Sequence, residues 1–139
     1  MSSVTKATEL LPRFQWLWLT LGWMLALVLG AGSLAPSVPS AAALFSDKFL
    51  HFGAYASLAF LFAGALGRRR WKNIALGLLL FGAALELLQQ LLTATRMGEW
   101  WDLAANAGGI ATGLLLAALI PGNWCRRVEA ALGLAEARQ

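Results

Sequence analysis

The sequence predicts an all-α integral membrane protein, a four-helix bundle with both termini in the cytoplasm. The first observation is composition: 59% of the residues are hydrophobic and only 13% are charged, with a mean hydropathy of +0.64. An ordinary soluble domain carries about 25% charged residues, so a water-soluble fold of this size could not cover its surface. The second observation is that the apolar residues are gathered into four long stretches, within a length that suits a single domain.

Each apolar stretch is long enough to cross the hydrocarbon core, which takes about 20 residues of helix. Glu86 is the only charged residue that falls well inside one of them. Because backbone polar groups must be paired in lipid and the stretches are rich in Leu and Ala, each should be a helix. We predict helices at about 14–34, 48–67, 72–93 and 102–120, within a single domain covering 1–139.

The first stretch has an alternative interpretation as a signal peptide, since Ser33-Leu34-Ala35 resembles a small-x-small cleavage site. Pro36 directly after it would hinder cleavage, and the apolar run is long for a signal. We therefore interpret the stretch as the first membrane span. Pro36 and Pro39 are expected to end this helix and to keep the following external loop extended.

The distribution of lysine and arginine predicts the orientation. Nine of the 11 basic residues precede the first helix, connect the second to the third or follow the fourth, and alternation places all nine on one side. Only Lys48 and Arg96 fall on the other side. The bias predicts a multi-pass protein of the cell (cytoplasmic) membrane, with a short basic cytoplasmic tail from about 121. The basic residues form flanking groups and no continuous stripe, which argues against a nucleic-acid partner.

The tail offers two interpretations. It either forms a short amphipathic helix on the inner membrane surface, with Val128, Leu132 and Ala135 on one face, or it is simply solvated. Cys125 is the only cysteine, so it cannot form an internal disulfide. We expect it near a cytoplasmic helix end, as a reduced and small apolar filler.

Polar residues gather near the external ends of three predicted helices. On the second helix, Asp47, His51 and Tyr55 follow one another at a spacing of four and therefore share a face. The third helix ends outside and the fourth begins outside, so their polar residues reach the same depth. The predicted polar site comprises Asp47, Lys48, His51, Tyr55, Glu86, Gln89, Arg96, Asp102 and Asn106.

Glu86 is the strongest functional candidate in this set. An acidic residue at the centre of a spanning helix costs about 2.5–3.5 kcal/mol on insertion scales and is functional by default. We expect Glu86 to face the bundle and to find a partner among Arg96, His51, Lys48 and Gln89, or to be protonated, since burial disfavours the charged form.

The other residues also have simpler interpretations. Asp47 and Asp102 suit helix N-terminal caps, and His51 suits a hydrogen-bonded packing residue. Tyr55 and the pair Trp100-Trp101 suit bundle packing and an aromatic belt. Gly109 and Gly113 predict a close-packing face for another helix, either within the chain or in another chain.

The ordered series of polar residues resembles the VanZ-like family. The resemblance rests on Asp47-Lys48-x-x-His51-x-x-x-Tyr55, on Glu86-x-x-Gln89, and on Arg96, Asp102, Asn106 and Gly109 at their spacings. It covers about 36–113, including the proline-containing external loop. The family is named for an accessory protein that reduces susceptibility to teicoplanin. The resemblance implies a bacterial inner-membrane protein of the cell envelope and supports the shared polar residues without assigning their roles.

Three functions fit these observations. We favour a binding or transport-like protein that engages an anionic lipid headgroup or envelope precursor in the outer leaflet, where Arg96, Lys48 and His51 would hold the phosphate. Membrane lipids are then its expected partners, besides other membrane proteins or a second copy contacting Gly109 and Gly113.

The first alternative is an enzyme acting on a lipid-linked substrate, with His51 and a carboxylate as base and acid. Asp47, His51, Glu86 and Asp102 would then offer ligands for a divalent metal, although no paired-histidine motif is present and no cofactor is predicted. The second alternative is a structural subunit of a larger membrane complex, in which the polar set only specifies helix packing.

Overall fold

The computed structural model describes residues 11–34, 41–92 and 100–134, and these ranges contain helices and no strand. Four helices in this part of the chain are long and apolar enough to cross a membrane. The predicted all-α membrane fold is therefore confirmed. The elements are α1 (Gln15–Leu34), α2 (Ala41–Leu66), the 3-10 helix η1 (Arg68–Arg70), α3 (Trp71–Leu92), α4 (Trp100–Leu119) and α5 (Trp124–Ala131).

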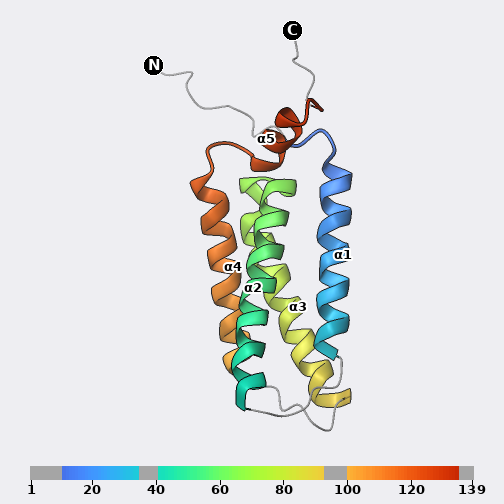
Figure 1. Cartoon of the computed structure of the whole chain (residues 1–139), viewed down its shortest axis with the longest axis vertical. Coiled ribbons are helices and arrows are strands. Elements are labelled where there is room, and N and C mark those ends of the chain that lie inside the picture. Colours follow the sequence, from blue (N-terminus) through green and yellow to red (C-terminus); the bar gives the residue numbers. More distant parts are fainter. Residues whose placement is uncertain (1–10, 35–40, 93–99, 135–139) are drawn as a thin grey trace.

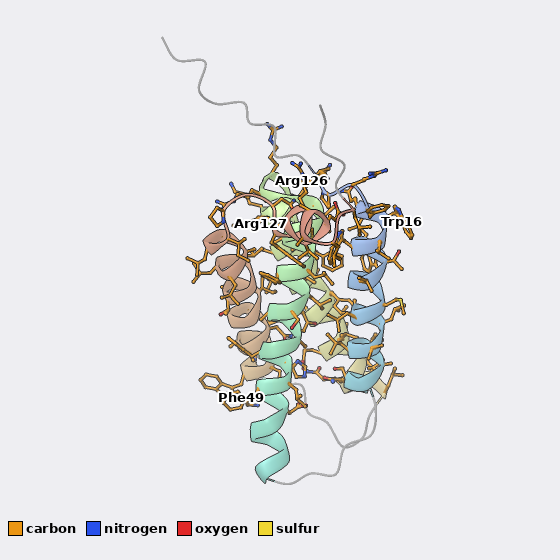
Figure 2. All side chains as sticks on the ribbon, turned by 45° about the horizontal axis from the view of Figure 1, so that its top comes forward. Trp16, Phe49, Arg126 and Arg127 are labelled. Carbon is orange, nitrogen blue, oxygen red and sulfur yellow. The ribbon has the colours of Figure 1, made fainter. Side chains whose placement is uncertain are left out.

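The four long helices run side by side, and the short helix α5 lies across one end of the bundle (Figure 1). We call this the α5 end; α1 begins there. At the opposite end, which we call the site end, α1 and α3 finish and α2 and α4 begin. Figure 2 shows Trp16, Arg126 and Arg127 at the α5 end and Phe49 toward the site end. That the α5 end faces the cytoplasm stays a prediction from the basic residues.

Two helices begin earlier than the sequence predicted. α2 begins at Ala41, where a start near Lys48 was expected, and α4 begins at Trp100. Asp47 therefore lies inside α2 and does not cap it, so the capping interpretation of this residue is wrong. The expected loop around Pro36 and Pro39 lies outside the described residues.

α2 packs on α4 with their backbones in close contact. A Cβ atom added to Gly109 would strike the carbonyl oxygen of Phe52, and one added to Gly113 would strike that of Ala56. Only glycine allows this approach, which is the physical reason small residues occur where spanning helices meet. The close-packing face is thus used within the chain, and association with another protein stays a prediction.

The α5 helix is fixed to the bundle by its first two residues and by the residue before them. Asn123 caps α5 by accepting a hydrogen bond from the backbone N–H of Arg126, and its amide donates to the carbonyl oxygen of Gly64 at 2.7 Å. The indole of Trp124 stacks on Phe60 and donates to the Phe60 carbonyl oxygen at 3.0 Å. Cys125, next in sequence, is fully buried.

Glu129 makes the second attachment of α5. Its carboxylate, which is only 2% exposed, accepts hydrogen bonds from the backbone N–H groups of Arg13 (2.7 Å) and Phe14 (2.9 Å) and from the indole of Trp18 (2.9 Å). It therefore caps the start of α1 from another helix. A short helix is thus present in the predicted tail, with Cys125 and Glu129 as its buried residues and Leu132 exposed. Its placement on the inner membrane surface stays a prediction, and Ala135 lies outside the described residues.

Candidate functional site

The polar residues of α2 meet those of α4 at the site end. Lys48 Nζ forms an ion pair with Asp102 Oδ1 at 3.2 Å. One turn further into the bundle, His51 Nδ1 and Asn106 Oδ1 are 3.0 Å apart. Both pairs follow from the contact of α2 with α4, because Lys48 and His51, three apart on α2, meet Asp102 and Asn106, four apart on α4. Asp102 lies in the first turn of α4, where its carboxylate contacts Lys48.

The contact with Asn106 fixes the orientation of the His51 ring. An amide oxygen only accepts hydrogen bonds, so the proton of this bond sits on His51 Nδ1. The other ring nitrogen, Nε2, then points toward Asp47 Oδ2 at 3.9 Å. His51 is the only histidine of the chain, and its two nitrogens face an amide on one side and a carboxylate on the other.

α3 approaches this pair through Gly82. A Cβ atom at Gly82 would lie 2.8 Å from Asn106 Nδ2 and 3.0 Å from the hydroxyl of Tyr55. Asn106 is completely buried and Tyr55 is 4% exposed, so the amide and the phenol are pressed against the α3 backbone. Glycine at this position makes the close contact possible.

Glu86 lies one turn beyond Gly82 on the same face of α3 and is buried. The expectation that Glu86 faces the bundle therefore agrees with its position. Arg96, one of its expected partners, lies outside the described residues.

Gln89 ties the end of α3 to the end of α1. Its side-chain nitrogen donates to both the carbonyl oxygen and the hydroxyl of Ser33, each at 2.6 Å, and Gln89 is buried. Ser33 was considered in the sequence only as part of a cleavage motif. No local signal marks it as a partner of Gln89, because the two residues are brought together only by the packing of α1 on α3.

A groove of about 560 Å³ opens between α1 and α2, with side chains of α3 completing its wall. Toward the site end its lining includes the polar residues Ser33, Asp47 and His51 beside the apolar Phe49 and Leu50, and Ser57 lines it further in. Its apolar lining continues toward the middle of the bundle. The apolar residues include Leu25, Val28, Leu29, Phe81 and Leu85. The size falls within the roughly 300–1,000 Å³ that small-molecule sites occupy.

Trp100 and Trp101 are 87% and 70% exposed, which is compatible with an aromatic belt. The metal-site interpretation does not match this geometry. In the described part of the chain, no group of three or more His, Cys, Asp or Glu side chains is arranged to hold a metal ion. Asp47, His51, Glu86 and Asp102 are all described, and they do not form the metal site considered from the sequence.

A comparison with protein-family models, with curated proteins and with solved structures finds no significant match to this chain.

Proposed function

We propose that this chain is a VanZ-like integral membrane protein of the bacterial cell envelope that binds the headgroup of an anionic lipid or lipid-linked envelope precursor. The observation that carries the proposal is the groove between α1 and α2, where Ser33, Asp47 and His51 lie toward the site end and mostly apolar side chains line the part toward the bundle centre. A lipid has the same division between a polar headgroup and an apolar chain. The sequence resemblance supports the family and the envelope location.

The groove is placed where a lipid molecule can enter it from the side. Val28 of α1 and Leu50 of α2 line the groove and are 67% and 68% exposed. In a helix that crosses the bilayer, such exposed apolar side chains face lipid chains. A bound lipid would need no passage through the protein interior, and its chain would lie along Leu25 and Leu29.

The headgroup would meet the polar residues at the site end. Lys48, which is partly exposed, carries three N–H donors, and Asp102 accepts from one of them. A phosphate oxygen would join this ion pair, with His51 in the adjacent turn and Arg96 expected from the following loop. The Asp102 carboxylate holds the Lys48 ammonium group in position, so a phosphate would join an existing ion pair.

The test is retention of anionic lipid by the purified full-length protein, measured by native mass spectrometry after mixing with phosphatidylglycerol and phosphatidylcholine. Val28→Trp would fill the groove, and we expect retention of phosphatidylglycerol to fall by about tenfold. Leu27→Trp is the matched control, because Leu27 is 72% exposed on the neighbouring face and does not line the groove. Equal retention by both variants would contradict the proposal.

A second variant examines the headgroup contact. Lys48→Gln should weaken retention of phosphatidylglycerol more than retention of phosphatidylcholine, because only the former carries a net negative charge. An equal loss for both lipids would mean that the groove binds lipid chains without recognising the anionic headgroup.

A further inference from the structure

His51 turns one of its two ring nitrogens toward the groove between α1 and α2. The side chain is 9% exposed and belongs to the groove lining. Nδ1 points to Asn106 of α4, which is completely buried and is not a lining residue. Nε2 points instead toward Asp47, which lines the groove as His51 does. Nε2 is therefore the nitrogen that a molecule in the groove would meet.

The chemical character of Nε2 follows from the bond made by the other nitrogen. In a neutral imidazole one nitrogen carries the proton and the other accepts a hydrogen bond. The proton sits on Nδ1, because the side-chain oxygen of Asn106 3.0 Å away can only accept. Asp47 Oδ2 is 3.9 Å from Nε2, which is longer than the 2.7–3.2 Å of an N–H···O hydrogen bond. Nε2 is thus a hydrogen-bond acceptor on the groove side of the ring.

This acceptor is held in a fixed position from behind. Asn106, which holds the ring through Nδ1, is itself pressed against α3, since a Cβ atom at Gly82 would lie 2.8 Å from its amide nitrogen. A ring whose partner is completely buried cannot turn without breaking a buried hydrogen bond. Binding to Nε2 therefore needs little further ordering of the protein, which favours affinity.

An acceptor at this place limits what the ligand can offer to it. The oxygens of an ionised phosphodiester carry no proton, so they cannot donate to His51 Nε2, and the phosphate is left to Lys48. The group that meets Nε2 must carry an O–H or N–H donor. Because the proposed lipid is anionic, this donor is an uncharged hydroxyl; an ammonium group would make the headgroup zwitterionic.

We propose that the groove selects an anionic lipid whose headgroup carries a hydroxyl group beyond the phosphate, and that this hydroxyl donates to His51 Nε2. The inference rests on the proposed lipid binding and names the headgroup chemistry of that same site. Lys48 and His51 are three residues apart on α2, so their side chains are neighbours, with about 5–6 Å between Cβ atoms. A glycerol or sugar headgroup can bridge this spacing from its phosphate to its hydroxyl.

The experiment compares two lipids of equal charge on the full-length protein by native mass spectrometry. Phosphatidylglycerol and phosphatidylethanol with the same acyl chains each carry one ionised phosphodiester, but only the former has headgroup hydroxyls. We expect phosphatidylglycerol to be retained about two- to tenfold better, the range that one hydrogen bond gives. Equal retention of the two lipids would overturn the inference and leave the binding of anionic lipid intact. Equal retention by Val28→Trp and Leu27→Trp would instead overturn the proposed groove binding itself.

Two substitutions assign the preference to one nitrogen of the ring. His51→Asn keeps a side-chain N–H near the position of Nδ1, where it can donate to Asn106, but removes Nε2. We expect it to retain both lipids equally, at the wild-type level for phosphatidylethanol. His51→Gln places an amide oxygen near the position of Nε2 and should keep part of the preference. A full preference for phosphatidylglycerol in His51→Asn would overturn the assignment.

A measurement on the wild-type protein needs no substitution and so does not depend on the folding of a variant. In lipid nanodiscs containing phosphatidylglycerol, the 15N NMR signal of His51 Nε2 should move from its position in phosphatidylethanol, because the nitrogen then accepts a hydrogen bond. An identical signal in the two lipids would overturn the inference. Retention of phosphatidylethanolamine as strong as that of phosphatidylglycerol would also overturn it, since the donor would then be an ammonium group.

Discussion

Replacing Glu129 should release α5 from the bundle. In Glu129→Gln the amide oxygen can replace the carboxylate oxygen that accepts from Phe14 and Trp18. The amide NH2 group then faces the backbone N–H of Arg13, which loses its 2.7 Å hydrogen bond. A hydrogen bond to a charged group contributes about 1.5–3 kcal/mol, and an unsatisfied buried donor adds a similar cost. We expect docking of α5 to weaken by about 2–3 kcal/mol.

Cys125 provides the assay, because it belongs to α5 and is fully buried while α5 is docked on the bundle. Burial, together with the charge of Glu129, raises the pKa of its thiol to about 12, so the docked thiol is both covered and protonated. A weakening of 2–3 kcal/mol corresponds to a rise of about 30- to 150-fold in the population with α5 undocked. Maleimide labelling of Cys125 should accelerate by that factor in Glu129→Gln.

The control is Ala130→Gln, an exposed position on the same helix, which should label at the wild-type rate. An unchanged labelling rate in Glu129→Gln would refute the reasoning, since it would mean that α5 stays docked without the carboxylate. Equal acceleration in Ala130→Gln would show that any change in α5 exposes the thiol.

The same carboxylate predicts a dependence on pH. Burial by itself raises the pKa of Glu129, but hydrogen bonds from Phe14, Trp18 and Arg13 and the charge of Arg126 outweigh it and lower the pKa below its ordinary value. The stabilisation is therefore complete above the ordinary glutamate pKa of about 4.3 and is lost as the pH falls through the lower pKa of the folded state. The difference in thermal midpoint between wild type and Glu129→Gln should shrink in that acidic range and stay constant near neutral pH.

Two further substitutions examine the close contacts between the spanning helices. Gly113→Ala places a methyl group against the Ala56 carbonyl oxygen, so α2 and α4 must move apart. Overpacking of this kind should destabilise the protein by about 1–3 kcal/mol. The measurement is the midpoint of thermal unfolding, which should fall. Gly82→Ala places the methyl group 2.8 Å from Asn106 Nδ2, and we expect a similar destabilisation. Because Asn106 is the amide partner of His51 and must move, the imidazole signals of isotope-labelled His51 should shift in the NMR spectrum. Wild-type stability in Gly113→Ala, or an unshifted His51 spectrum in Gly82→Ala, would contradict the respective contact.

The sequence by itself determined the four spanning helices and the face shared by the polar residues of α2. Hydropathy over about 20 residues and the 3.6-residue period are local properties, so they can be recognised without a structure. The spacing of four between Asp47 and His51 therefore predicted their proximity, and the glycines of α4 predicted a close helix contact. The position of Glu86 in an apolar stretch likewise indicated that it faces the bundle.

The tertiary structure alone decided which helices are neighbours and hence which side chains are partners. The four spanning helices are similarly apolar, so hydropathy does not rank their possible contacts. Pairing of Gln89 with Ser33 depends on α3 packing against α1, and capping of α1 by Glu129 depends on α5 lying across the bundle end. These contacts join residues far apart in sequence, and their hydrogen-bond geometry exists only once the helices have packed.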